Sequence, residues 1–265
     1  MFFRRRKERK LAEAMRTSTL NGDVERVKAL LKENPGLANT QDEYGITPLH
    51  RAGNANVAEL LISKGADVNA RNSSGATPLY SAALEGIADV VELLISKGAD
   101  VNAHSTDGYT PLFWAAMKGH VEVMRILLAQ GAAVDAPDQF GQTPLSIAVS
   151  QGDAEVVRVL LVHGANINAR ISKVLDWTPL HRAASEGHVE VARVLLAHGA
   201  NINARTSIGT TPLHSAALEG RADVVELLIS KGADVNARTR DGSTASQFAA
   251  HKGHARVVEL LGKHS

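Results

Sequence analysis

The stretch GITPLHRAGNANVAELLISKGADVNA, from Gly45 to Ala70, decides the fold because its pattern returns along the chain. The next copy begins at Gly75 and reads GATPLYSAALEGIADVVELLISKGADVNA. Further copies in the same frame begin at Gly108, Gly141, Thr178 and Thr211 and, with most of the motif lost, at Thr244. The spacing from Gly75 to Gly108 is 33 residues, and a fixed period of this length is typical of a repeat architecture.

Each unit is predicted to form two short helices followed by a loop. The Thr77-Pro78 pair indicates a helix start, because a Thr oxygen accepts from free N–H groups and Pro at the first position loses no hydrogen bond. Apolar residues at Val90, Leu93 and Leu94 follow helical spacing and predict a second helix. We expect that helix to stop at Gly98, before a segment rich in turn residues.

The recurring motifs TPLH, GHxEVV and LLxxGADVNA resemble the ankyrin repeat, and the resemblance covers almost the whole chain. It implies an all-α ankyrin-repeat solenoid of stacked helix-turn-helix units with projecting hairpin loops, about eight units including both caps. It also implies a non-catalytic protein–protein interaction scaffold that binds its partner on the concave face and the hairpin tips. One unit cannot bury its apolar face alone, so stability comes from each unit and its neighbours.

The pattern predicts a basic N-terminal arm over 1–10 and one ankyrin-repeat domain over 11–265. Within that domain, 11–42 lacks the TPLH motif and is expected to be the N-terminal cap. The repeats then occupy 43–240, and a more polar last unit, 241–265, is expected to be the C-terminal cap.

Two units depart from the period. The unit that begins at Gly45 is 30 residues long, and alignment places the loss of three residues at the turn between its helices, around 53–56. The spacing from Thr143 to Thr178 is 35 residues, and the two extra residues are placed in the loop 171–177. We expect the binding surface to depart from the generic one at these two places.

One segment is almost a copy of another. Ser81–Ala103 and Ser215–Ala237 differ at a single position, where Arg221 replaces Ile87. This similarity indicates internal duplication, not two equal binding sites.

Composition limits the classes of function. Apolar residues make up 44% of the chain, aromatic residues only 4%, and there is no cysteine. The cysteine count excludes a disulfide framework and thiolate chemistry, and it fits a reducing compartment, so we expect a cytoplasmic monomer. The net charge of +1 gives no overall attraction to nucleic acid. No apolar run reaches the roughly 18 residues of a membrane span.

The arm at 1–10 holds six basic residues and one acid and leaves an alternative open. It can be a solvated, partly disordered lead into the first helix. It can also make the protein a membrane-surface or nucleic-acid adaptor, tethered by charge with Phe2 and Phe3 as anchors. Apart from this arm, no nucleic-acid or membrane contact is expected.

Eleven histidines could suggest metal or catalytic chemistry, but they sort by position in the repeat. Three occupy the TPLH position, namely His50, His181 and His214; three follow the inter-helix glycine, namely His120, His188 and His254. Equivalent positions in stacked units lie roughly 8–10 Å apart, too far to share one zinc ion. The resemblance implies that the TPLH histidines join repeats by hydrogen bonds. We therefore expect no catalytic residue, cofactor, metal or small-molecule substrate.

The Asn of ADVNA and ANINA is expected to satisfy the backbone of its own loop. The resemblance adds that such an Asn can be hydroxylated in eukaryotic ankyrin proteins. The positions are Asn69, Asn102, Asn168, Asn203 and Asn236.

Candidate partner-binding residues are those that the resemblance places at hairpin tips and on first helices. They are Tyr44, Tyr80, Tyr109, Phe113, Trp114, Met117, Lys118, Phe140, Gln151, Trp177, Arg182 and Glu186. Large aromatic side chains and Arg are favoured as interface anchors. For Phe113 and Trp114 a second interpretation stays open, in which the rings fill gaps in the core. The identity of the protein partner does not follow from these residues.

Overall fold

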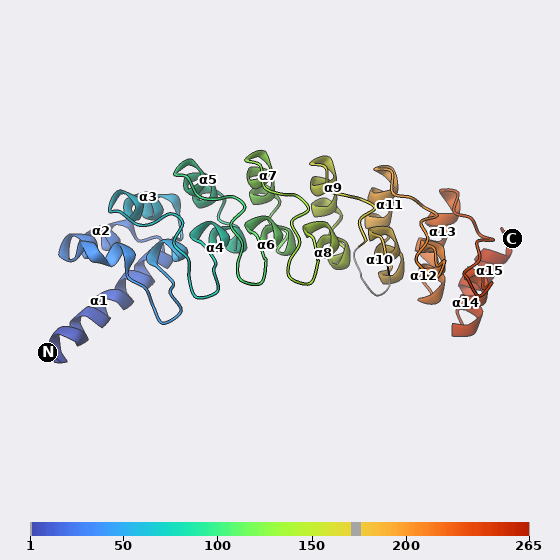
Figure 1. Ribbon diagram of the computed structural model, residues 1–265, viewed down its shortest axis with the longest axis horizontal. Helices are drawn as coiled ribbons and strands as arrows, with labels where there is room; N and C mark the ends of the chain where they lie inside the picture. Colours follow the sequence, from blue (N-terminus) through green and yellow to red (C-terminus); the bar gives the residue numbers. More distant parts are fainter. Residues whose placement is uncertain (1, 171–175, 265) are drawn as a thin grey trace. The chain divides into compact units, whose positions relative to one another are not determined.

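The computed structural model describes residues 2–170 and 176–264, with side chains from Lys7 onward within those ranges (Figure 1). In these ranges the chain forms helices and loops without a strand, which confirms the all-α prediction. It divides into two compact units, Met1–Gln139 and Phe140–Ser265. Each is described by itself.

The first unit consists of paired helices joined by loops. Its elements are α1 (Phe2–Leu20), α2 (Val24–Glu33), η1 (Pro35–Asn39), η2 (Pro48–Arg51), α3 (Ala55–Ser63), α4 (Pro78–Glu85), α5 (Ala88–Ser96), α6 (Pro111–Met117) and α7 (Val121–Ala129), where η marks a 3-10 helix. In Figure 1 the first helices α4 and α6 lie in one row beside the long loops, and the second helices α3, α5 and α7 lie in the other.

The second unit repeats this arrangement. Its elements are α8 (Pro144–Gln151), α9 (Ala154–Val162), α10 (Pro179–Glu186), α11 (Val189–Ala197), α12 (Pro212–Leu218), α13 (Ala222–Ser230), α14 (Ala245–Lys252) and α15 (Ala255–Gly262). Helix α10 packs on α12, and α12 packs on α14, so each first helix contacts the next. The insertion expected in 171–177 lies mostly outside the described residues.

The predicted helix signals act at both ends of α4. The Thr77 hydroxyl oxygen accepts from the N–H of Tyr80 at 3.3 Å, and Pro78 occupies the first helical position. Gly86 ends the helix in the left-handed conformation with φ 75°. A Cβ on Gly86 would lie 2.6 Å from the His120 ring, so both the backbone angle and the close approach require glycine.

The core of each unit forms where the apolar stripes meet. Val90 and Leu94 of α5 are fully buried, as are Leu79 and Ala83 of α4. Burying one such Leu or Val side chain stabilises the fold by about 1.5–3 kcal/mol. Small residues such as Ala83 let α4 lie close to both α5 and α6. The core is therefore shared between neighbouring repeats, as in other stacked repeat folds.

The TPLH histidines join repeats, as predicted. The Nε2 of His181 donates to the carbonyl of Thr210 at 3.0 Å, while its Nδ1 accepts from the Thr178 hydroxyl at 2.8 Å. Burial lowers the pKa of His181 to about 4, because the charged imidazolium is disfavoured away from water. His50 and His214 make the same contacts, to Ala76 and Ser243, and burial lowers the pKa of each.

The second histidine position also links repeats, by reaching back along the chain. The side-chain nitrogen donates to a carbonyl near the end of the preceding first helix. The pairs are His120 with Leu84, His188 with Ser150, and His254 with Leu218, and Arg221 takes the same role toward Ser185. This position is therefore structural in these four repeats.

The prediction for the Asn residues was wrong in one respect. The amide of Asn69 does not serve its own loop: its Nδ2 donates to Gly98, and its Oδ1 accepts from the N–H of Asp100. Asn102 makes the equivalent pair with Gly131 and Ala133. The amide has both a donor and an acceptor, so it can satisfy one group of each kind in the next repeat.

The position of the three-residue loss also differs from the prediction. The turn keeps its length, and the first helix is shortened instead: η2 has 4 residues, whereas α4 has 8. The turn is fixed because the N–H of Gly53 donates to the carbonyl of Thr19 and Asn54 caps α3. The missing residues are therefore those that correspond to the last turn of α4.

Residues 2–10 continue the backbone of helix α1, which runs to Leu20. Lys7 pairs with Glu33 of α2, with 2.8 Å between Nζ and Oε1. The division of the chain into arm, caps and repeats stays a prediction. Within the described part, none of the helices combines the length and hydropathy required to cross a bilayer.

Candidate partner-binding surface

Four aromatic residues of the first unit come together on α4, α6 and the loop before α6. We call Tyr80, Tyr109, Phe113 and Trp114 the aromatic cluster. The Tyr80 and Trp114 rings meet edge-on with centroids 6.0 Å apart, and Tyr109 lies 5.5 Å from Trp114. Tyr109 also contacts Phe113, with centroids 4.8 Å apart. The four rings thus form one continuous contact network across two repeats.

Within the cluster, burial separates surface from core. Phe113 is only 2% exposed, so its ring belongs to the core and is not available to a partner. Tyr80, Tyr109 and Trp114 are half-buried and present part of each ring to solvent. Phe113 therefore supports the Tyr109 ring from beneath. The signal was in the repeat itself, because Phe113 occupies the position of the TPLH histidines, and His50, His181 and His214 are buried too.

Burial also affects the hydroxyl of Tyr80. The loss of water around it raises the pKa of Tyr80, and contacts with Trp114 and Ser105 partly oppose that rise. The phenol is therefore neutral throughout the physiological range. A neutral hydroxyl gives this aromatic surface one polar group beside the apolar Trp114 ring.

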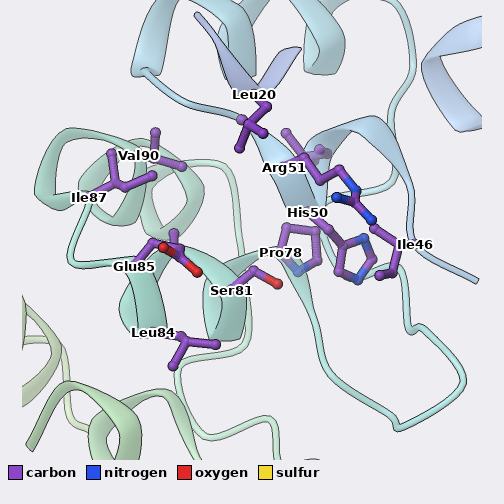
Figure 2. Close-up of a pocket in the computed structure, with 13 residues that line it drawn as sticks. Leu20, Ile46, His50, Arg51, Pro78, Ser81, Leu84, Glu85, Ile87 and Val90 are labelled. Atoms are coloured by element: carbon purple, nitrogen blue, oxygen red, sulfur yellow. The ribbon is translucent and has the colours of Figure 1, made fainter. Parts of the chain in front are cut away.

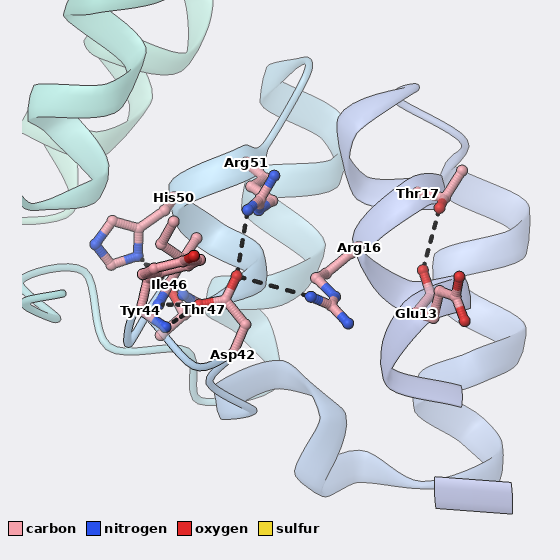
Figure 3. Close-up of polar contacts among 9 residues, drawn as sticks. All are labelled: Glu13, Arg16, Thr17, Asp42, Tyr44, Ile46, Thr47, His50 and Arg51. Atoms are coloured by element: carbon pink, nitrogen blue, oxygen red, sulfur yellow. Dashed lines mark hydrogen bonds and ion pairs between the residues drawn. The ribbon is translucent and has the colours of Figure 1, made fainter. Parts of the chain in front are cut away.

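Tyr44 stands at a loop tip and is 62% exposed. Its backbone is held by Asp42, whose Oδ1 accepts from the N–H groups of Tyr44 and Ile46, each at 3.0 Å (Figure 3). The other oxygen of Asp42 pairs with Arg51 at 3.2 Å and with Arg16 at 3.8 Å. This carboxylate therefore ties a loop tip to both α1 and η2.

Burial alone would raise the pKa of the Asp42 carboxyl. The N–H groups of Ile46 and Tyr44, together with Arg51, more than offset that effect and hold the pKa below its usual value. The carboxylate is therefore charged, and the loop that carries Tyr44 is held in place. The sequence analysis did not predict this network. The available signal was Asp42 itself, which stands at the position where the next unit has Asn72.

Loop tips of the first unit are also bonded to one another. The N–H of Ser73 donates to Tyr44, that of Thr106 to Ser74, and that of Gln139 to Asp107, at 2.8, 2.8 and 3.0 Å. At the end of α6, Met117 is half-buried and Lys118 is exposed. These bonds hold successive tips in register.

The candidates in the second unit form a separate set. Phe140 is 68% exposed, and Gln151 is exposed at the end of α8. Trp177 is half-buried and stacks on His181, with centroids 6.5 Å apart and an interplanar angle of 18°. Part of the Trp177 ring is therefore already engaged within the unit.

Arg182 and Glu186 form a polar group on α10. The Arg182 Nε and Glu186 Oε1 atoms are 2.6 Å apart, and Arg182 Nη2 donates to the Ser150 hydroxyl at 2.9 Å. The second oxygen of Glu186 lies 3.4 Å from His188 Nε2. Arg182 and Glu186 are paired with each other, so neither side chain presents an unbalanced charge at the surface of α10.

Known protein families match this chain over almost its full length. The family described as "Ankyrin repeats (3 copies)" matches residues 14–105, 98–171 and 170–239, and "Ankyrin repeats (many copies)" matches 219–261. The chain belongs to the ankyrin-repeat family. Ankyrin repeats generally mediate protein–protein interaction, and the family is typically non-catalytic.

Among curated proteins, the ankyrin-repeat chain is similar to the 2-5A-dependent ribonuclease of Mus musculus. The two are 40% identical over 67 residues, which is 24% of this chain and 9% of the ribonuclease. The match thus covers a small part of that protein and does not establish ribonuclease activity here. Among the described residues, no three His, Cys, Asp or Glu side chains gather as metal ligands would.

Proposed function

We propose that this ankyrin-repeat protein is a non-catalytic scaffold that binds a protein partner through the loop tips and first helices of its first unit. The observation that carries the proposal is the aromatic cluster, in which Tyr80, Tyr109 and Trp114 are half-buried around a buried Phe113. Rings held in place by one another lose little freedom on binding, so their contact with a partner is not offset by ordering.

Residues near the aromatic cluster support partner binding on the same face of the first unit. Tyr44 is exposed at a tip that Asp42 and two arginines hold, and Lys118 is exposed at the end of α6. A patch of aromatic anchors with a charged rim is typical of interface hot spots. The expectation of a cytoplasmic monomer belongs to this proposal, and the second unit's Phe140 and Trp177 are secondary candidates.

The adaptor alternative rests on the basic residues at 1–10. Of their side chains, the structure describes those from Lys7 onward, and Lys7 is paired with Glu33. No contact of the described residues favours lipid or nucleic acid over protein. The scaffold is therefore the better-supported function.

The proposal can be tested by a pull-down from lysate of the source organism, with retained proteins identified by mass spectrometry. Wild-type protein is compared with a Tyr109→Ala/Trp114→Ala double variant. The matched control is Val162→Ala, which removes an apolar side chain that is 70% exposed on the second helix α9. Circular dichroism verifies that all three proteins are folded, and Phe140→Ala tests the second unit separately.

We expect a protein that wild type and Val162→Ala retain and the double variant loses. A partner retained equally by all three proteins would overturn the assignment of this surface. A partner lost only after deletion of 1–10, with strong dependence on salt, would favour the adaptor instead.

A further inference from the structure

The missing helical turn leaves a pocket in the first unit. It has a volume of about 260 Å³ and lies between the end of α1, the short helix η2, and the pair α4 and α5 (Figure 2). Apolar side chains from all of these elements line it, among them Leu20, Leu49, Leu84, Ile87 and Val90. Leu20 is 59% exposed at its edge.

A second change in the sequence matches this pocket. In four other repeats the residue in the position of Ile87 reaches back to the carbonyl of a first helix, as His120 does to Leu84 and Arg221 to Ser185. Asp153 has the same position but caps its own helix α9 instead. For Ile87 that carbonyl does not exist, because the turn that would supply it is missing from η2. Here the nearly duplicated segment has an isoleucine, and its side chain lines the pocket. The shortened helix and the apolar replacement thus belong together.

The polar groups at the pocket favour a neutral occupant. Arg51 lines it, and its Nε is buried with no hydrogen-bond partner among the described residues. The charge of Arg51 is already balanced by Asp42, at 3.2 Å. Glu85, which is exposed and also lines the pocket, would repel a carboxylate. The site therefore offers apolar walls, and the one cation that lines it is already paired, which suits a neutral aliphatic group.

The size fits one side chain. The volume exceeds the roughly 150 Å³ of an apolar cavity that binds benzene and is below the roughly 300 Å³ at which pockets for drug-sized ligands begin. In sibling repeats the first helix continues for a further turn, which carries Ala83-Leu84-Glu85 or Ala116-Met117-Lys118. The central residue of the turn that this repeat lacks is thus Leu or Met in those repeats.

We propose that this pocket receives a leucine- or methionine-sized side chain of the protein partner. The inference rests on the proposed protein-binding function and adds an anchor site to it. The partner completes the turn that the repeat lacks.

The test is a methyl NMR titration of the full chain with N-acetyl-leucine-N-methylamide, which carries the aliphatic side chain and the amide carbonyls. We expect shifts of the Ile46, Leu84 and Ile87 methyls that saturate in the millimolar range. The Leu213 and Leu218 methyls, in the sibling repeat, provide the internal control and should not shift. The alanine analogue should bind at least about tenfold more weakly, since it buries fewer methylene groups.

A variant in which the pocket is filled provides the matched control. Insertion of Ala-Leu-Glu between Ala52 and Gly53, combined with Ile87→Arg, restores the sibling sequence and should abolish the shifts. Ser81→Leu, which extends a side chain from the pocket wall, should do the same if the insertion does not fold. Unchanged shifts in either folded variant, or no shifts in wild type, would overturn the anchor site.

Two further outcomes separate this inference from the proposed function. Tighter binding of 4-methylpentanoate than of the leucine amide would show that the pocket binds a small aliphatic acid. It would overturn the assignment of the pocket to a side chain of the partner. The titration needs no partner, so its failure would overturn the pocket as an anchor site but would not affect the proposal that the aromatic cluster binds a partner. Failure of the pull-down overturns the scaffold, and with it the protein occupant, even if the leucine amide binds.

Discussion

At the scale of single residues, the buried TPLH histidines show how neutral side chains stabilise a repeat stack. His181 is 0% exposed, and both of its ring nitrogens are hydrogen-bonded. One bond fixes the start of its own helix, and the other fixes the loop of the next repeat. Protonation would add a charge away from water and remove the acceptor at Nδ1.

This arrangement predicts that the second unit loses stability in mild acid. The pKa of His181 is lowered from 6.5 to about 4, so the unfolded chain binds the proton first. Its contribution is fully present above pH 6.5 and is lost as the pH falls from 6.5 toward 4, about 3 kcal/mol in all. An NMR titration of the His181 ring should give a pKa well below 6; a value near 6.5 would contradict the account.

Substitution of His181 provides a second prediction. His181→Ala should destabilise the protein by about 2–4 kcal/mol, because it leaves a cavity and an unpaired buried carbonyl. The control is His198→Ala, since His198 is exposed and the contact of its Nδ1 is with Val194, within its own repeat. Urea unfolding at pH 7 measures both variants. Equal losses would show that the contact between repeats is not what the histidine contributes.

At the scale of elements, the short helix η2 shows that a loss of residues can be absorbed in more than one way. The turn that follows is fixed by Gly53, where a Cβ would lie 2.2 Å from the carbonyl oxygen of Leu20. That approach is possible only for glycine, so the turn could not shorten. The helix lost its last turn instead, and the pocket opened beside it.

Gly53→Ala is therefore expected to be costly. The clash is with backbone, which cannot rotate away, and we expect a loss of more than about 2 kcal/mol. The matched control is Gly65→Ala, where a Cβ meets nothing within 4 Å and only the φ of 83° is unfavourable. That strain is worth roughly 1 kcal/mol. Urea unfolding should rank Gly53→Ala as the more destabilised; the reverse order would contradict the role given to Gly53.

The single difference between the duplicated segments provides another comparison. Arg221→Ile should cost about 0.5–1.5 kcal/mol, because the hydrogen bond to Ser185 is lost. Ile87→Arg should bring no matching gain, because no carbonyl stands opposite it. Thermal unfolding of the two variants measures the difference. A stabilised Ile87→Arg protein would mean that position 87 has an acceptor after all.

Much of the fold and part of the site could be predicted from the sequence. The period, the Thr-Pro helix starts and the histidine links follow from local chemistry that repeats. The location of the lost turn did not follow, since an alignment cannot know that Leu20 packs on Gly53. The Asn amides were misassigned because a local turn and a link to the next repeat use the same side-chain groups. The burial of Phe113 could have been inferred, because this residue occupies the position of the buried TPLH histidines.

At the scale of the whole molecule, each unit is a stack in which every repeat contacts its neighbours. Both rows of helices take part in this packing, while the exposed loop tips and the half-buried aromatic rings keep groups available to a partner. The aromatic cluster and the pocket beside η2 both lie in the first unit, and both are assigned to partner binding. We therefore predict that the first helices and loop tips of that unit carry the interaction.

The most direct measurement of this claim is hydrogen–deuterium exchange of the chain with and without the partner captured in the pull-down. We predict slower exchange on binding in α4, α6 and the loops 42–46, 72–76 and 105–109, with α3 and α7 unchanged. The Val162→Ala protein should give the same map. Slower exchange confined to α3 and α7, with the loops and first helices unaffected, would contradict this claim.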